Sequence, residues 1–152
     1  EHIYIVPAEC KRITDIITSR WHKRTAYVRY LVEQCKVKGY LVNPFGRLRV
    51  FYDRRAAAAV DFIPQSIVAD MLWCVLRPIA QYVRKLGGRL TTSVHDSVLV
   101  QVPEDKVIEC MVGVKAIMER TFDCVAPGFF VPVEVEVGKP GASWADLEEV
   151  AA

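Results

Sequence analysis

The stretch that most constrains this chain is residues 89–102, RLTTSVHDSVLVQV, where two β-forming runs flank a central His95-Asp96 pair. Valine and threonine favour strands, and glycines at 87 and 88 and a proline at 103 mark the ends of the stretch. The pattern predicts an antiparallel hairpin with a carboxylate at or beside its tip. Such a tip can hold one charged group in a cleft. A His-Asp pair alone is more typical of an ordinary turn than of a functional site. Other parts of the sequence are needed to distinguish the two.

The composition is that of a folded protein. The chain has 152 residues, of which 52% are hydrophobic and 25% charged, which suits one domain with a real core and excludes disorder. No apolar run approaches the ~20 residues that span a bilayer, so we expect no membrane partner. The chain starts with Glu1-His2 and not with methionine, which is typical of a cleavage product or of part of a longer polypeptide.

The five cysteines show neither a CxxC motif nor a Cys/His cluster. Their odd number argues against a disulfide framework, and their spacing argues against a zinc site. We therefore expect reduced, mostly buried thiols in a cytoplasmic protein.

Charge is distributed unevenly along the chain. Residues 1–55 carry 12 Lys and Arg against 5 Asp and Glu, whereas residues 56–152 carry 8 against 13. A basic half beside an acidic half suggests one surface for a polyanion and another for a metal or a partner. Basic, solvated helix faces would explain the same numbers.

Two amphipathic helices are expected before residue 39. The first begins near Pro7, with an apolar stripe of Cys10, Ile13, Ile17 and Trp21. Thr25 is a candidate cap for the second helix, and Gly39 is a good stop signal. Their other faces carry cations that could contact phosphates: Lys11, Arg12, Arg20, Lys23, Arg24, Arg29, Lys36 and Lys38.

Residues 40–52, YLVNPFGRLRVFY, predict a second hairpin, with Asn43-Pro44 and Gly46 in its turn. Arg47 and Arg49 would share one side of an extended strand, because side chains alternate. Two guanidiniums on one face suit phosphate or base-edge contacts. An edge strand kept soluble by charge is the plainer interpretation.

Residues 54–86 predict a long, mostly buried helix, in which Pro64 and Pro78 would bend or restart the chain. Gln65, near the start of its apolar part, could present an amide donor and acceptor to a base-pair edge. It could equally be an ordinary exposed residue.

After the central hairpin we expect a helix from Pro103 to about Phe122, and then a strand at residues 130–137, FVPVEVEV. The order helix, strand, strand, helix, strand predicts an α+β fold. We expect an antiparallel three-stranded sheet that is backed by helices and has one open face. Asp96 would lie at the edge of that open face.

Four stretches together resemble the C-terminal part of family-A DNA polymerases. Residues 39–49, GYLVNPFGRLR, are similar to the family's GY…T-x-FGR-x-R hairpin, and residues 61–70, DFIPQSIVAD, to N-x-P-x-QG-x-A-A-D. Residues 93–97, SVHDS, resemble the VHDE of polymerase motif C, and residues 133–144, VEVEVGKPGASW, the terminal VEVEVG…W. The order and the intervals match over nearly the whole chain.

This resemblance implies that residues 1–39 are the C-terminal part of the fingers and residues 40–152 are the palm. Asp96 would be one of two aspartates that hold the two catalytic Mg²⁺ ions, and His95 would position the primer end. The remaining site residues would contact primer-template DNA: Arg47 and Arg49 its backbone, Gln65 its minor groove, and Ser97 the DNA near the tip.

The departures from the family pattern are informative. Ser97 stands where the family often has Glu, so an accessory carboxylate is lost, and Ser66 replaces Gly in a way that resembles a divergent phage-type branch. The family's second metal-binding aspartate and its triphosphate-binding fingers helix lie upstream of the matching region. We therefore expect a companion segment to supply them, in a bacterial or phage-infected cell, and expect this chain alone to be inactive.

Two other functions remain open at this stage. A non-catalytic nucleic-acid-binding α+β module would use an open antiparallel sheet, although such modules need exposed aromatics that the central hairpin lacks. A His-Asp metal phosphohydrolase would need further histidine ligands, and only His2 and His22 remain.

Overall fold

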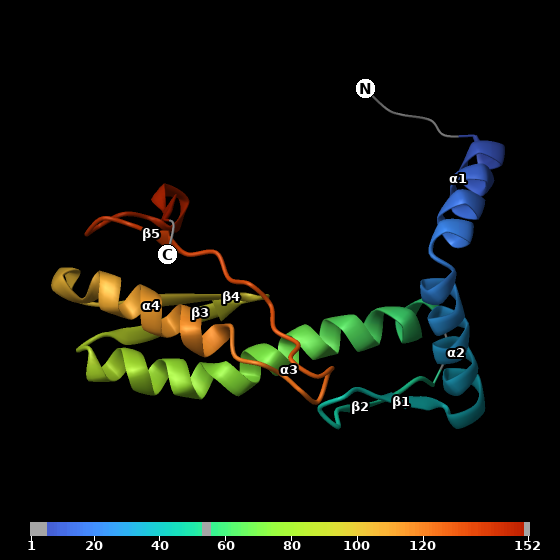
Figure 1. Cartoon of the computed structure of the whole chain (residues 1–152), viewed down its shortest axis with the longest axis horizontal. Helices are drawn as coiled ribbons and strands as arrows, with labels where there is room; N and C mark the ends of the chain where they lie inside the picture. Colours follow the sequence, from blue (N-terminus) through green and yellow to red (C-terminus); the bar gives the residue numbers. More distant parts are fainter. Residues whose placement is uncertain (1–5, 53–55, 151–152) are drawn as a thin grey trace. The chain divides into compact units, whose positions relative to one another are not determined.

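The computed structural model describes residues 6–52 and 56–150, with the side chains of 56 and 57 excepted. It divides into two compact units, Glu1–Pro64 and Gln65–Ala152. Figure 1 labels the elements along the chain. The predicted helix start at residue 54, together with Glu1 and His2, lies outside the described residues.

The first unit starts with two consecutive helices, α1 (Pro7–Arg20) and α2 (His22–Lys38). A proline at the first position and the Glu9–Arg12 ion pair support the start of α1. Gly39 ends α2 with φ 77°, as predicted. The second helix begins at His22, not at a Thr25 cap: Thr25 lies inside α2, where its hydroxyl donates to the carbonyl oxygen of Trp21 at 3.3 Å.

The core of the first unit leaves α1 out. No described residue of α1 is buried, and its predicted apolar stripe is exposed. The core instead forms where α2 meets the hairpin of β1 (Tyr40–Val42) and β2 (Leu48–Val50) and the start of α3 (Ala56–Lys85). Its buried residues are Leu31, Cys35, Leu41, Phe51, Ala59, Phe62 and Ile63.

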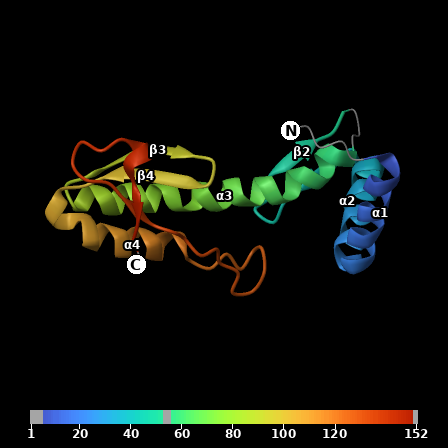
Figure 2. The same ribbon diagram turned by 90° about the horizontal axis from the view of Figure 1, so that it is seen from above.

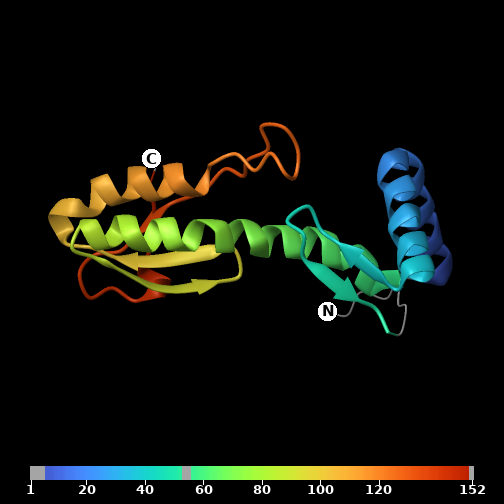
Figure 3. The same ribbon diagram turned by 90° about the horizontal axis from the view of Figure 1, so that it is seen from below.

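Helix α3 runs from Ala56 to Lys85 as one element, through both Pro64 and Pro78. In the second unit its buried apolar side chains recur every four residues, at Met71, Val75, Ile79 and Val83. This is the spacing of a helix with one face on a core. Figures 2 and 3 show its C-terminal half with a β-hairpin along one side and α4 (Val107–Met118) along the other.

The hairpin predicted at residues 89–102 is present as β3 (Arg89–Val94) and β4 (Ser97–Gln101), followed by the short 3₁₀ helix η1 (Glu104–Lys106). Its base needs a glycine, because a Cβ on Gly88 would lie 2.3 Å from the carbonyl oxygen of Gln101.

The α+β class is confirmed, but the three-stranded sheet is wrong. Of residues 130–137, only Glu136 and Val137 form a strand, β5 (Glu136–Val137), which pairs with β6 (Glu148–Glu149) after η2 (Trp144–Asp146). The described residues therefore form three separate two-stranded antiparallel sheets. The valine-rich segment has β-propensity, but propensity alone does not provide a pairing partner.

The prediction of mostly buried thiols is also wrong. Cys35 and Cys110 are buried, whereas Cys10, Cys74 and Cys124 are exposed. Burial raises the pKa of the Cys110 thiol, because an apolar environment disfavours the thiolate.

Candidate functional site

The tip of the β3–β4 hairpin is a two-residue loop made of His95 and Asp96. The last cross-strand pair is Val94 with Ser97, and the Ser97 hydroxyl donates to the Val94 carbonyl oxygen at 2.8 Å, closing the turn. Both loop side chains are exposed. The Asp96 carboxylate is therefore open to solvent and not buried against the helices, as a metal ligand at a hairpin tip requires.

His95 adopts a backbone conformation that is unusual for its residue type. Its φ is 55°, and no other non-glycine residue among those described has a positive φ. Tight two-residue hairpin turns need a positive φ at their first central position, which glycine normally supplies. A histidine there costs about 1–2 kcal/mol relative to an unstrained backbone. Strain of this kind gathers at functional sites.

The hairpin also contains a β-bulge near its base. Leu90 pairs with Val100 and Thr92 with Leu99, so Thr91 is an extra residue on β3. A bulge increases the local twist and changes which residues share a face. Beyond it, Thr92, Val94 and the cross-strand Leu99 and Ser97 point to one side of the ladder.

Gln65, the predicted minor-groove contact, is exposed on α3. Two polar neighbours, Ser66 and Asp70, are buried in the same helix, at 7% and 9% exposure, and neither was predicted as a site residue. Both have interaction partners, as buried polar groups normally do. Their spacing of four residues in an apolar stripe was the available signal.

The turn of the first hairpin is organised by a buried asparagine. The Asn43 side-chain oxygen accepts hydrogen bonds from the backbone N–H of Phe45 at 3.0 Å and of Arg47 at 2.9 Å. An Asx side chain in this role mimics backbone and fixes the turn. Arg47 thus lies in the turn before β2, and the strand-alternation argument applies to Arg49 but not to Arg47.

Arg49 rests on two aromatic rings. Its guanidinium carbon lies 5.2 Å from the ring centroid of Phe51 and 5.9 Å from that of Phe62. The two rings meet edge to face, with centroids 5.9 Å apart and planes at 74°, a favoured geometry. Both rings are buried, whereas Arg49 is exposed. The sequence signal for Phe51 was its position two residues after Arg49, on the same side of an extended chain.

The donor chemistry at the tip fits magnesium in part. A carboxylate oxygen is the kind of ligand that Mg²⁺ prefers, and Asp96 offers one. Within residues 6–52 and 56–150, no three His, Cys, Asp or Glu side chains gather where they could hold a metal ion. Glu136 belongs to the separate β5–β6 sheet. Asp96 can therefore serve as one ligand, and the remaining ligands would have to come from elsewhere.

The predicted site residues fall into two groups. Arg47 and Arg49 belong to the first unit, while Gln65 and the tip residues His95, Asp96 and Ser97 belong to the second. The structure brings the three tip residues together.

By length and composition, the segment Ala58–Lys85 of α3 could cross a membrane, but soluble core helices pass the same test, so this is weak support for a span.

Comparison with known proteins gives a consistent answer. A family model described as DNA polymerase family A matches residues 1–146. The chain is 31% identical over 137 residues to the thermostable DNA polymerase I of Thermus filiformis, covering 84% of this chain and 16% of that protein. With the DNA polymerase I of Chloroflexus aurantiacus it shares 27% identity, covering 93% of this chain and 16% of the relative.

A solved structure agrees with these relatives. The POL domain of Pol1 from M. smegmatis, in complex with DNA primer-template and dNTP, matches with a TM-score of 0.68 and 25% sequence identity. The match covers 76% of this chain and 22% of that chain. This chain spans 15–16% of the length of the first relatives it matches.

Proposed function

Because the chain belongs to DNA polymerase family A, we propose that it is the C-terminal part of a template-directed DNA polymerase that extends a primer in the 5′ to 3′ direction. The resemblance of the chain to family-A DNA polymerases is confirmed. In this proposal residues 1–39 are the C-terminal part of the fingers and residues 40–152 are the palm. The phage-type affinity of the Ser66 region stays a prediction.

The observation that carries the proposal is the exposed Asp96 carboxylate at the tip of the β3–β4 hairpin, inside the motif that resembles motif C. Asp96 is proposed to hold Mg²⁺ in a two-metal site. Such a pair of ions would activate the primer 3′-oxygen and neutralise the charge on the leaving pyrophosphate. His95, held beside Asp96 by the same turn, is proposed to position the primer end.

Primer-template DNA is the proposed macromolecular partner, and a deoxynucleoside triphosphate (dNTP) the proposed small substrate. Arg49 would contact the DNA backbone from its aromatic support, and Arg47 from the turn that Asn43 organises. Gln65 would contact the minor groove, where all base pairs present similar hydrogen-bond acceptors. Ser97 would contact DNA beside the tip.

A companion segment is the second part of the proposal. Bridging two divalent ions takes at least two converging carboxylates, and in the described part of this chain Asp96 stands without such a cluster. A segment carrying the second aspartate and the triphosphate-binding helix would complete the site. The named relatives are bacterial polymerases, so we place this protein in the cytoplasm of a bacterial or phage-infected cell.

A chimera tests the proposal directly. The matched segment of the thermostable DNA polymerase I of Thermus filiformis is replaced by this chain, and primer extension is measured with Mg²⁺ after circular dichroism shows that the chimera folds. We expect extension by the chimera and none by the 152 residues alone. Asp96→Ala in the chimera should lower the rate about 10²–10³-fold, since a metal site supplies several kcal/mol of transition-state stabilisation.

Asp105→Ala is the matched control, because Asp105 is an exposed aspartate of the same unit, in η1. It should leave primer extension unchanged. Extension by the isolated chain would refute the need for a companion. A folded chimera whose activity survives Asp96→Ala while its DNA affinity is intact would favour the non-catalytic binding module.

A further inference from the structure

The junction between α1 and α2 is a break of a single residue, Trp21. Its backbone, at φ −112° and ψ 58°, is not helical, yet the chain stays hydrogen-bonded across it. The Trp21 N–H donates to the Ile17 carbonyl oxygen at 3.0 Å, and the Thr25 N–H donates to the Trp21 carbonyl oxygen at 3.1 Å. The indole is left 54% exposed on this well-connected backbone.

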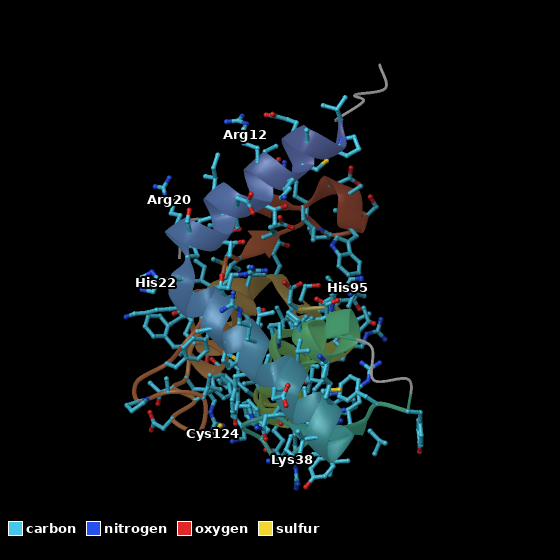
Figure 4. The ribbon with its side chains drawn as sticks, turned by 90° about the vertical axis from the view of Figure 1, so that its right-hand side faces the viewer. Arg12, Arg20, His22, Lys38, His95 and Cys124 are labelled. Atoms are coloured by element: carbon cyan, nitrogen blue, oxygen red, sulfur yellow. The ribbon has the colours of Figure 1, made fainter. Side chains whose placement is uncertain are left out.

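The break opens a hollow of about 680 Å³ that is open to solvent. Its volume lies within the range of pockets that hold small organic groups. It is lined by Ile17, Arg20, Trp21, His22, Lys23 and Arg24. Figure 4 shows Arg20 and His22 projecting on the same side of the junction.

The hollow is strongly cationic. No acidic residue occurs between Asp15 and Glu33, a stretch that contains Arg20, Lys23, Arg24 and Arg29. Ion pairs in the described chain join Arg12 to Glu9 and Lys106 to Glu109, and none of the three cations in the hollow has one. Unneutralised cations on a concave surface attract polyanions.

Two more exposed aromatics continue from the hollow along α2. Tyr27 is 49% and Tyr30 57% exposed, and with Lys23 they follow the i, i+4, i+7 spacing of one helix face. Partial burial raises the pKa of Tyr27, and the charge on the nearby Tyr30 raises it further. The hollow thus offers an indole and several cations, and the helix that leads away from it offers two exposed phenols.

We propose that this surface, defined as Trp21, Tyr27 and Tyr30 with Arg20, Lys23 and Arg24, binds single-stranded nucleic acid. Cations along a groove follow the phosphates, and exposed rings stack on successive unpaired bases. A duplex cannot use Trp21 in this way, because its bases already stack on one another. An acidic peptide would use the cations but would leave the aromatic rings without partners. The inference extends the proposed polymerase function to the unpaired strand, but requires neither catalysis nor Asp96.

Tryptophan fluorescence provides the first test. The chain has three tryptophans, so a Trp73→Phe, Trp144→Phe background leaves Trp21 as the only reporter. We expect an oligo-dT strand of about 12 nucleotides, within the usual site size, to quench the Trp21 emission in a saturable way, without metal or dNTP. A folded chain whose emission does not respond to saturating oligo-dT would overturn the proposal.

Affinity measurements by fluorescence anisotropy separate stacking from charge. Trp21→Ala should weaken oligo-dT binding about tenfold, the scale of one stacked base, while Trp21→Phe should keep most of the affinity. The slope of affinity against salt should not change, because no cation is lost. Trp73→Ala, which removes a 68% exposed indole from α3, is the matched control and should bind as the unmodified chain does.

Charge reversal tests the contribution of the cations to binding. Lys23→Glu with Arg24→Glu should weaken binding and reduce the salt slope by about 0.7 for each lost phosphate contact. Lys36→Glu with Lys38→Glu, at the far end of α2, is the matched control and should do much less. Equal losses from both pairs, or equal affinity for a 12-base-pair duplex, would overturn the proposal. Asp96→Ala should leave binding unchanged, so failure here is distinguishable from failure of the proposed catalytic role.

Discussion

The hydroxyl of Tyr82 on α3 donates a 2.9 Å hydrogen bond to the backbone carbonyl oxygen of Glu109 on α4. The ring of the same tyrosine lies directly over Gly113, where a Cβ would come within 2.2 Å of the ring carbon Cζ. These two contacts set how closely the two helices approach beside the central hairpin. Gly113 is therefore required by packing, although a glycine in a helix normally weakens it.

Gly113→Ala should destabilise the chain by about 1–3 kcal/mol through overpacking, although helix propensity alone would favour alanine by about 1 kcal/mol. The midpoint and slope of urea denaturation measure the effect. In a Tyr82→Ala background the ring is gone, and the same change should become neutral or stabilising. A coupling energy near zero in this double-mutant cycle would contradict the packing argument.

A pH-sensitive cap lies near the C-terminal end. The Asp146 carboxylate accepts hydrogen bonds from the Ser143 hydroxyl at 2.6 Å and from the Ser143 backbone N–H at 3.0 Å. These two bonds hold the pKa of Asp146 below its usual 3.8. Because the pKa is depressed in the folded state, the stabilisation is complete above pH 3.8 and is lost as the pH falls through the folded value.

Carbon NMR titration of the Asp146 carboxyl checks this prediction. Ser143→Ala should raise the pKa of Asp146 part of the way back toward 3.8, because the hydroxyl is lost while the backbone donor remains. Ser143→Thr keeps a hydroxyl and should preserve the depressed pKa. An Asp146 pKa that does not respond to Ser143→Ala would show that the cap is absent in solution.

The sequence predicted turns and helix ends correctly where neighbouring residues alone determine them. The turn at His95-Asp96 was predicted because β-forming runs end on either side of it, and Gly39 ended α2 because only glycine adopts its φ of 77° readily. The start of α2 was misplaced, because the helix begins after Trp21 without a side-chain cap. No capping rule identifies such a junction.

The remaining errors concern partners that are distant in sequence. Residues 130–137 have the composition of a strand, yet only Glu136 and Val137 find a partner, in β6. The support of Arg49 by Phe62 joins residues that are 13 apart in sequence and lie on different elements. Periodicity reports which face of an element is apolar, but not which element covers that face.

The DNA contact proposed for Arg49 should depend on the aromatic rings beneath its guanidinium group. Phe62→Leu keeps an apolar side chain in the core but removes the ring face, so Arg49 loses part of a cation–π contact of about 0.5–1 kcal/mol. If Arg49 contacts the primer-template backbone, Phe62→Leu should weaken DNA binding two- to fivefold. The salt slope should stay constant, because the charge remains.

Two further variants complete this test. Arg49→Gln should reduce the salt slope, and adding Phe62→Leu to it should cause little further loss of DNA affinity. Phe130→Leu, at an exposed phenylalanine, is the matched control for a lost ring. Fully additive losses from Arg49→Gln and Phe62→Leu would show that the two residues act independently.

His95 allows the conformation of the tip to be separated from its chemistry. Both His95→Gly and His95→Ala remove the imidazole, but glycine accepts a φ of 55° without strain, whereas alanine does not. In the folded state, the glycine variant should therefore be favoured over the alanine variant by about 1–2 kcal/mol. The greater freedom of glycine in the unfolded chain reduces the measured difference to about 1 kcal/mol.

Primer extension by the chimera should respond differently. If His95 positions the primer end through its imidazole, both variants should lose activity to a similar extent, even though one hairpin is more stable than the other. If only the shape of the turn matters, the glycine variant should keep its activity and the alanine variant should lose it. Urea denaturation and primer extension on the same pair of variants therefore decide whether the left-handed histidine holds the turn or acts on the substrate.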